Sequence, residues 1–379
     1  MNEDLDRLRL ARTEGVGPIL YRRLLRRFGS AAAALEAVPG LARNGGRPTP
    51  PTVPSRAEAE REFDLAARAR ATLIFLGSPA YPPLLALLED APPVIAVQGH
   101  PTALTGRGIA IVGSRNASAN GQRIAETMAE EMAREGLVVV SGLARGIDAA
   151  AHAGALRGGR TVACVAGGID VPYPPEHAGL QARIAAGGAV VSEAPPGTAP
   201  LGRLFIRRNR VIAGLALGVV VVEAAQRSGA LVTARRGLEA GREVFAVPGS
   251  PLDPRCRGAN GLIRQGARLV ETASDVLADL PCAPGEGLGL LPGFSCPDRL
   301  REPPPEPVAT PPGDSAEVAL ARAQLADLLG PSPTSVDELI RRSHFSPAAV
   351  LGALLELEVA GRLQTFPGNM VALLAEPGH

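Results

Sequence analysis

The sequence predicts an α/β protein built on a doubly wound, mostly parallel sheet, with a helical domain before the sheet and a winged helix after it. Three observations lead to this prediction. From Thr72 onward, short apolar runs alternate with amphipathic segments, which is the pattern of alternating strands and helices. One run, Gly218 to Val222, is unbroken and β-branched, as expected of a strand covered by helices on both faces. Finally, a Pro-rich stretch at residues 283–314 separates the last segment from the rest.

The elements of the sheet region are expected within residues 71–282. Strands are predicted at residues 72–76, 94–97, 109–112, 138–140, 161–166, 189–191, 218–222 and 243–247. Amphipathic helices are predicted between them, at residues 121–135, 147–157 and 230–240. Parallel strands connected in this way open onto a ligand-binding rim at their carboxyl ends.

Residues 1–70 are predicted to be helical. Gly15 and Gly17 lie between two helical patterns, as in SAM-like and helix-hairpin-helix domains. Such hairpins grip DNA phosphates through backbone N–H groups, and four arginines follow nearby: Arg22, Arg23, Arg26 and Arg27. A packing helix with a solvated basic side explains the same pattern equally well.

Residues 283–314 read REPPPEPVATPPGD near their end, a composition that forms neither helix nor central strand, so we predict a linker. In residues 315–379 the order helix, turn, helix and hairpin indicates a winged helix. Its expected recognition helix, residues 347–360, contains Glu356 and Glu358 and no basic residue. Acidic side chains disfavour insertion into a DNA groove, so a protein-contact module or an inert appendage is the preferred interpretation.

Composition limits the possible functions. All 39 Lys and Arg positions are arginine, so a catalytic or P-loop lysine is excluded. The net charge of +1 requires any nucleic-acid site to be a local patch. The four cysteines lack paired CxxC spacing, so we expect no zinc, no disulfide framework and no cofactor. We expect a cytoplasmic protein without a membrane segment, because no apolar run is long enough and the first residues are charged.

The most informative stretch begins just before the 218–222 strand. Arg207, Arg208, Asn209 and Arg210 precede the strand, and Ser228 and Gly229 follow it at the expected start of a helix. Guanidinium groups match phosphate geometry, and a helix start favours negative charge. We therefore predict phosphate recognition here, in preference to a solvated basic helix face.

Two other strand ends carry small residues and arginine. Gly113, Ser114 and Arg115 follow one strand, and Arg115 is a candidate phosphate ligand. A second turn contains Gly142 and leads into a helix with Asp148 in its first turn. Neither turn has GxGxxG spacing, and GxxxxGK is absent from the chain.

Catalytic signals are weak. Asp148 and His152 lie four apart on one predicted helix face, which suits either an acid/base pair or a structural contact, and we favour the structural role. Glu193 is the best remaining carboxylate. Because no nucleophile has an adjacent base or lies in a GxSxG elbow, we do not expect an enzyme.

Several long motifs in one order resemble the DprA/Smf family of DNA-processing proteins. They are IVGSR, VSGLARGIDAAAH, GGIDVPYPPEH, SEAPPG, RRNRVIAGL, VVVEAAQRSGALVTA, GREVFAVPGS and GANGLIRQGA, within residues 71–280. The resemblance implies an extended Rossmann-like domain that dimerises. It also implies a protein that binds single-stranded DNA cooperatively, shields it, and loads the RecA recombinase during natural transformation.

The resemblance also implies a set of residues that face the DNA backbone. One departure is Pro175, which stands where the family often has a basic residue, so one phosphate contact is in doubt. The low aromatic content, 3%, favours backbone contacts over base stacking. The implied residues are Gly113, Ser114, Arg115, Ser141, Gly142, Arg145, Arg207, Arg208, Asn209, Arg210, Ser228 and Gly229.

Two alternatives belong to other functional classes. The sheet domain is also distantly similar to the LOG family of nucleotide phosphoribohydrolases, which would cleave a nucleoside monophosphate. That family carries PGGxGTxxE, whereas this chain has RSGALVTARR there, so hydrolysis is disfavoured. A transcription regulator acting through the winged helix is disfavoured by the acidic helix at residues 347–360.

Overall fold

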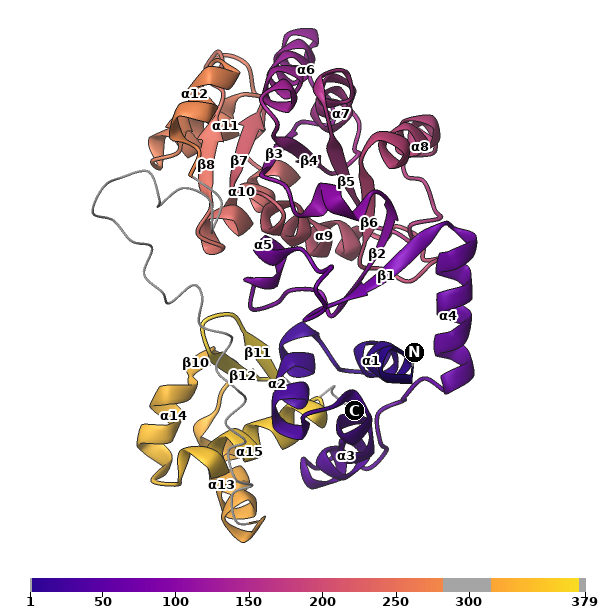
Figure 1. Ribbon diagram of the computed structural model, residues 1–379. Helices are drawn as coiled ribbons and strands as arrows, with labels where there is room; N and C mark the ends of the chain where they lie inside the picture. The colour runs from indigo at the N-terminus through magenta and orange to yellow at the C-terminus, as the bar shows by residue number, and fades with distance from the viewer. Residues whose placement is uncertain (1, 282–314, 375–379) are drawn as a thin grey trace, which may run out of the picture. The chain divides into compact units, whose positions relative to one another are not determined.

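A computed structural model describes residues 2–281 and 315–374 (Figure 1). The described residues divide into two compact units. Residues 62–281 form one unit, and residues 2–61 together with 315–374 form the other. The linker predicted at residues 283–314 lies outside the described residues. No helix among the described residues has both the length and the apolar character needed to cross a bilayer.

The larger unit contains a nine-stranded sheet in the order β1-β2-β6-β5-β4-β3-β7-β8-β9. All neighbours from β6 to β9 pair in parallel, whereas β2 pairs antiparallel with both β1 and β6. This confirms the predicted mostly parallel α/β fold. The strands are β1 (Ala71–Phe75), β2 (Val94–Gly99), β3 (Gly108–Gly113), β4 (Val138–Ser141), β5 (Thr161–Val165), β6 (Ala189–Ser192), β7 (Gly218–Val222), β8 (Glu243–Ala246) and β9 (Arg268–Leu269).

Helices cover both faces of this sheet (Figure 1). Ile109 and Ile111 of β3 pack in one hydrophobic cluster with α6, α7 and α12, while Ala110 and Val112 pack in the other with α9, α10 and α11. The alternation follows from the two-residue period of a strand. The helices of this unit are α5 (Pro83–Ala86), α6 (Ala119–Arg134), α7 (Ile147–Gly158), α8 (Ala178–Gly187), α9 (Gly202–Gly214), α10 (Gly229–Glu239), α11 (Arg257–Arg264) and α12 (Ala273–Asp279), with short 3₁₀ turns at Pro101–Leu104 and Pro175–His177. Helix α4 (Arg56–Arg68) contains the boundary between the two units.

The smaller unit joins the two ends of the chain. Its three-stranded sheet has the order β10-β12-β11 and, with the helices before it, confirms the predicted winged helix. Leu355 and Val359 of α15 are buried in one cluster with the N-terminal helices. The elements are α1 (Asn2–Arg12), α2 (Pro18–Phe28), α3 (Ala31–Asn44), α13 (Ser315–Leu328), β10 (Thr334–Ser335), α14 (Val336–Ser343), α15 (Pro347–Val359), β11 (Leu363–Phe366) and β12 (Met370–Leu373).

Candidate nucleic-acid interface

The candidate interface lies where the strand order reverses, at the carboxyl ends of β3 and β7. These strands pair directly, with Gly113 opposite Val222. The chain leaves β3 toward α6 on one face of the sheet and leaves β7 toward α10 on the other. Diverging connections open a crevice between the two loops, which is where open α/β sheets bind ligands.

The crevice is a cavity of about 530 Å³. Two exposed arginines, Arg115 and Arg227, line it, and neither forms an ion pair within the described part of the chain. Ser228 caps α10, its hydroxyl accepting from the N–H of Ala230 at 3.3 Å. The first residue of α10, Gly229, is exposed at the cavity wall. A helix start beside two unpaired guanidinium groups favours an anion.

An aromatic side chain adjoins these cations. The guanidinium carbon of Arg115 lies 5.1 Å from the ring centroid of Phe205, near the start of α9. Tyr173 packs edge-on against the same ring, at 5.4 Å between centroids. Phe205 was not among the predicted site residues. The ring orients Arg115 and offers a small stacking surface beside the phosphate-binding groups.

Two more of the predicted arginines are exposed but carry carboxylate partners. Arg207 donates to Glu193 at 2.6 Å. Arg145 donates to Glu176, and this hydrogen bond raises the pKa of the arginine and lowers the pKa of the glutamate. The Arg145–Glu176 pair is at the surface, where an ion pair contributes little to stability and exchanges readily for another anion. In the other pair the guanidinium of Arg207 is exposed, whereas the Glu193 side chain is only 12% exposed.

The other two arginines of the cluster, Arg208 and Arg210, are buried, although Arg208 also lines the cavity. Nη1 of Arg208 donates to the carbonyl oxygens of Gly142 and Cys164, the latter at 2.7 Å. Arg210 is 5% exposed and pairs with Glu193 at 2.6 Å. Adjacent residues on a helix point in different directions, so only some of a consecutive run can reach one groove.

Two further predicted residues also serve the protein itself. Ser141 is fully buried, and its hydroxyl donates to the Ile111 carbonyl at 2.6 Å. Asn209 lines the cavity, but its amide donates to the Gly229 carbonyl at 3.3 Å and so holds the start of α10. These side chains position the loops of the crevice and have their hydrogen bonds already formed.

Gly142 brings two buried charges close together. A Cβ built on it would lie 1.9 Å from Nη1 of Arg208 and 2.7 Å from Oδ2 of Asp148. That carboxylate accepts from the N–H of Gly142 at 3.2 Å, which holds the turn between β4 and α7. Burial raises the pKa of the Asp148 carboxyl, and the charge of Arg208 opposes the rise. Only glycine fits at position 142.

Asp148 and His152 have separate partners in the structure. Nδ1 of His152 lies 2.7 Å from the hydroxyl of Thr161, which itself donates to the Val139 carbonyl. Burial lowers the pKa of His152 to about 3. The histidine is therefore neutral at physiological pH and fully buried, so the favoured structural interpretation is the one that the geometry supports.

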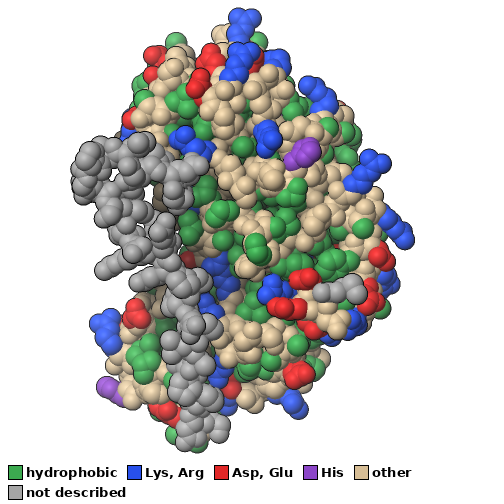
Figure 2. All heavy atoms as spheres, viewed as in Figure 1, with side chains coloured by type: hydrophobic (Ala, Val, Ile, Leu, Met, Phe, Trp, Pro, Cys, Tyr) green, Lys and Arg blue, Asp and Glu red, His purple; other side chains and the backbone are tan. Residues whose placement is uncertain are grey.

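Arg227 is a cavity residue that was not predicted from the sequence. It directly precedes Ser228, so its position next to a predicted helix cap was a usable signal. On the face shown in Figure 2, arginine side chains are scattered among acidic and apolar ones, in agreement with the net charge of +1. The cationic character of the crevice is therefore local.

In the smaller unit, the helix expected to recognise DNA is covered. Arg23 of α2 donates to Glu358 at 3.1 Å and to Thr365 at 3.1 Å, so it faces the winged helix. The amide of Asn44 donates to Glu356 at 2.9 Å. With α2 and α3 packed against it, α15 is not available to enter a groove, which agrees with the preference for a role other than groove binding.

Comparisons with family models match almost the whole chain. Residues 72–281 match the model of DNA recombination-mediator protein A. Residues 1–65 match the DprA-like N-terminal HHH domain, and residues 304–369 match the DprA winged helix domain.

The similar proteins carry the names Smf or DprA. The chain is 41% identical over 303 residues to Protein Smf of Escherichia coli, covering 79% of this chain and 77% of that protein. It is 44% identical over 208 residues to DNA processing protein DprA of Bacillus subtilis, covering 54% and 70%. The crystal structure of DprA from Streptococcus pneumoniae matches with a TM-score of 0.65 and 35% identity, covering 75% of this chain and 99% of that one. DNA processing protein A of Helicobacter pylori, described for its single-stranded DNA binding mode, matches with a TM-score of 0.51 and 26% identity, covering 56% and 99%.

Proposed function

Because this chain belongs to the DprA/Smf family of DNA-processing proteins, we propose that it binds single-stranded DNA along the loops that follow β3 and β7. The observation that carries the proposal is the cavity lined by Arg115, Arg227 and the start of α10. These groups recognise phosphates and no particular base, so binding is tolerant of sequence and sensitive to salt. The relative from Helicobacter pylori, studied for its single-stranded DNA binding mode, supports the choice of ligand.

The proposed path of the DNA backbone uses the exposed groups. Arg115 and Arg227 form its centre, and Arg145 and Arg207 extend it once a phosphate replaces their carboxylate partners. Backbone N–H groups of the turns add neutral donors. The proposed contact residues are Gly113, Ser114, Arg115, Arg145, Arg207, Arg227, Ser228 and Gly229, and the buried Ser141, Gly142, Arg208, Asn209 and Arg210 are proposed to hold them in place.

We further propose that the protein acts in the cytoplasm as a homodimer that shields incoming DNA during natural transformation and loads RecA onto it. The matching family model, DNA recombination-mediator protein A, and the relative named DNA processing protein DprA support a role in recombination and DNA processing. We propose that the role is binding without catalysis, because Asp148 and His152 are both buried and tied to the protein.

A salt titration tests DNA binding. Fluorescence anisotropy with single-stranded and duplex oligonucleotides of equal length is expected to show a preference for the single strand. Arg115→Ala is expected to weaken binding by about tenfold to a hundredfold, the loss of one charge-assisted contact, and to flatten the salt slope. Arg134→Ala, which removes an exposed arginine at the far end of α6, is the matched control. Equal affinity and slope for Arg115→Ala and Arg134→Ala would contradict the proposed site.

RecA loading needs its own measurement. On single strands already bound by this protein, RecA filament assembly is expected to be faster than on bare strands, and Arg115→Ala is expected to lose that advantage. Assembly that is equally fast on both substrates would reject loading and leave DNA binding standing. Analytical ultracentrifugation of the full chain measures the oligomeric state, independently of the DNA-binding and RecA assays.

A further inference from the structure

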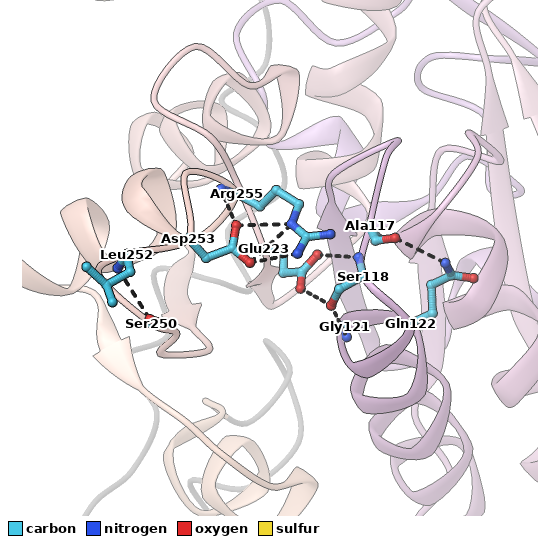
Figure 3. Close-up of polar contacts among 9 residues, drawn as sticks. All are labelled: Ala117, Ser118, Gly121, Gln122, Glu223, Ser250, Leu252, Asp253 and Arg255. Atoms are coloured by element: carbon cyan, nitrogen blue, oxygen red, sulfur yellow. Dashed lines mark hydrogen bonds and ion pairs between the residues drawn. The ribbon is translucent and has the colours of Figure 1, made fainter.

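Glu223 occupies the place where folds of this type hold the phosphate of a nucleotide. In doubly wound sheets, nucleotides bind where the strand order reverses. The first strand at this point is followed by a turn and a helix, and the N-terminus of that helix binds the phosphate. Here that turn connects β3 to α6, a helix of 16 residues with no acidic side chain in its first turn. Glu223 reaches this helix start from the neighbouring strand, β7 (Figure 3).

The carboxylate is tied to the cap of α6. It accepts from the Ser118 N–H at 2.9 Å and from the Ser118 hydroxyl. The same hydroxyl accepts from the Gly121 N–H at 2.9 Å. A Cβ built on Gly121 would lie 2.5 Å from the Cδ of Glu223, so the carboxylate sits directly on the first turn of the helix. Glu223 therefore places a carboxylate at the N-terminal end of α6, held by its cap residue Ser118, where a bound phosphate would otherwise lie.

The backbone of Glu223 is also unusual. Its φ is +52°, which lies in the left-handed region. A residue with a side chain adopts this conformation only at a cost in conformational energy. The Glu223 carbonyl accepts from the Ser114 N–H at 2.8 Å, so one strained residue holds the loop after β3 with its backbone and the start of α6 with its side chain. Strain of this kind persists where the surroundings enforce it, commonly at functional sites.

We propose that Glu223 is a specificity determinant, a resident anion that closes the nucleotide-phosphate position of the fold. A free nucleotide would have to bring its phosphate against a carboxylate that already lies at the first turn of α6 and accepts from its cap residue, Ser118. The cavity on the α10 side has no such carboxylate among its lining residues, apart from the buried Asp148, and keeps its cations available. The chain thereby excludes nucleotides at one helix start and leaves the other open to an anion.

Two substitutions separate the charge of Glu223 from its volume. Glu223→Gly suits the positive φ and empties the position, and Glu223→Gln keeps most of the volume but removes the charge. Glu239→Gln, at the exposed end of α10, is the control for losing one carboxylate. The probes are AMP and inorganic phosphate, and the readouts are calorimetric titration and the rise in melting temperature at low salt.

Glu223→Gly is expected to bind AMP at least about tenfold more tightly than the unsubstituted chain, with phosphate competing and Glu223→Gln intermediate. Glu239→Gln is expected to behave as the unsubstituted chain. Equal AMP affinity in all four proteins, or AMP binding that phosphate does not displace, would overturn the proposal. The role proposed for Glu223 does not rest on the proposed function. If none of the four proteins bound single-stranded DNA, the proposed function would be contradicted, and the AMP affinities would still test the role of Glu223.

Discussion

Arg207 donates to Glu193 at 2.6 Å, so a carboxylate of the chain already holds one of the arginines proposed to bind DNA. The same oxygen of Glu193 accepts from Arg210 at 2.6 Å. The exposed Arg207 can exchange this shared carboxylate for another anion, whereas the buried Arg210 remains paired with it. The ion pair between Arg207 and Glu193 therefore determines whether Arg207 is available to bind a phosphate.

Glu193→Gln is expected to strengthen single-stranded DNA binding by about three- to tenfold, because Arg207 no longer has a competing anion. The slope of log K against log salt is expected to steepen by about 0.7, the value for one more neutralised phosphate on a single strand. Anisotropy titrations between low and physiological salt measure both. Glu239→Gln serves as the control, and an unchanged slope would show that Arg207 is outside the DNA path.

Arg208→Met is expected to lower the free energy of unfolding by about 3–5 kcal/mol, because it leaves two buried carbonyl oxygens without a donor and a buried carboxylate without its cation. Arg207→Met is the matched control on the same helix, and it is expected to change stability by less than about 0.5 kcal/mol because its side chain is exposed. Urea unfolding of both proteins makes the comparison. Similar midpoints for the two would mean that Arg208 does not hold the turn at Gly142.

His152 is expected to make stability depend on pH. Its folded pKa, about 3, lies below the ordinary histidine value of 6.5, so the unfolded chain binds the proton more tightly. The contribution is complete above pH 6.5 and is lost as the pH falls from 6.5 toward about 3, with a slope of about 1.4 kcal/mol per pH unit. His152→Asn keeps a donor for Thr161 and cannot titrate. Urea unfolding at pH 7 and pH 5 should show a smaller difference for this variant, and an equal difference would assign the pH dependence elsewhere.

Gly45→Ala is expected to loosen the packing of α3 on α15. A Cβ at Gly45 would lie 2.0 Å from the Glu356 carbonyl oxygen and 2.6 Å from the Cβ of Ala360. A Cβ at Gly40, inside α3, meets nothing within 4 Å, so Gly40→Ala is expected to stabilise by about 0.5–1 kcal/mol, whereas Gly45 is the residue that caps the end of α3. Melting temperatures of the two variants should move in opposite directions. A shift of the same sign for both would show that the contact with α15 is not close.

Much of the fold could be predicted because its signals are local. The β-branched run of β7 is found at the predicted residues, Gly218–Val222, and the helix after Ser228 begins at Gly229 as the cap and small residues indicated. Strand β9 was not predicted, since a two-residue pair, Arg268–Leu269, has no periodicity of its own. The cover of α15 by α2 and α3 was not predicted either, because it joins segments more than 300 residues apart.

The fold class, the family, and the arginines and small residues at strand ends could all be predicted, because composition, residue order and short-range spacing specify them. Which arginines remain available to a ligand became clear in the folded protein. Arg115 and Arg227 are exposed in the crevice, Arg207 shares a carboxylate, and Arg208 is used inside the protein. Exposure and pairing depend on partners brought from distant segments, such as Glu193 and Gly142, which no local pattern specifies.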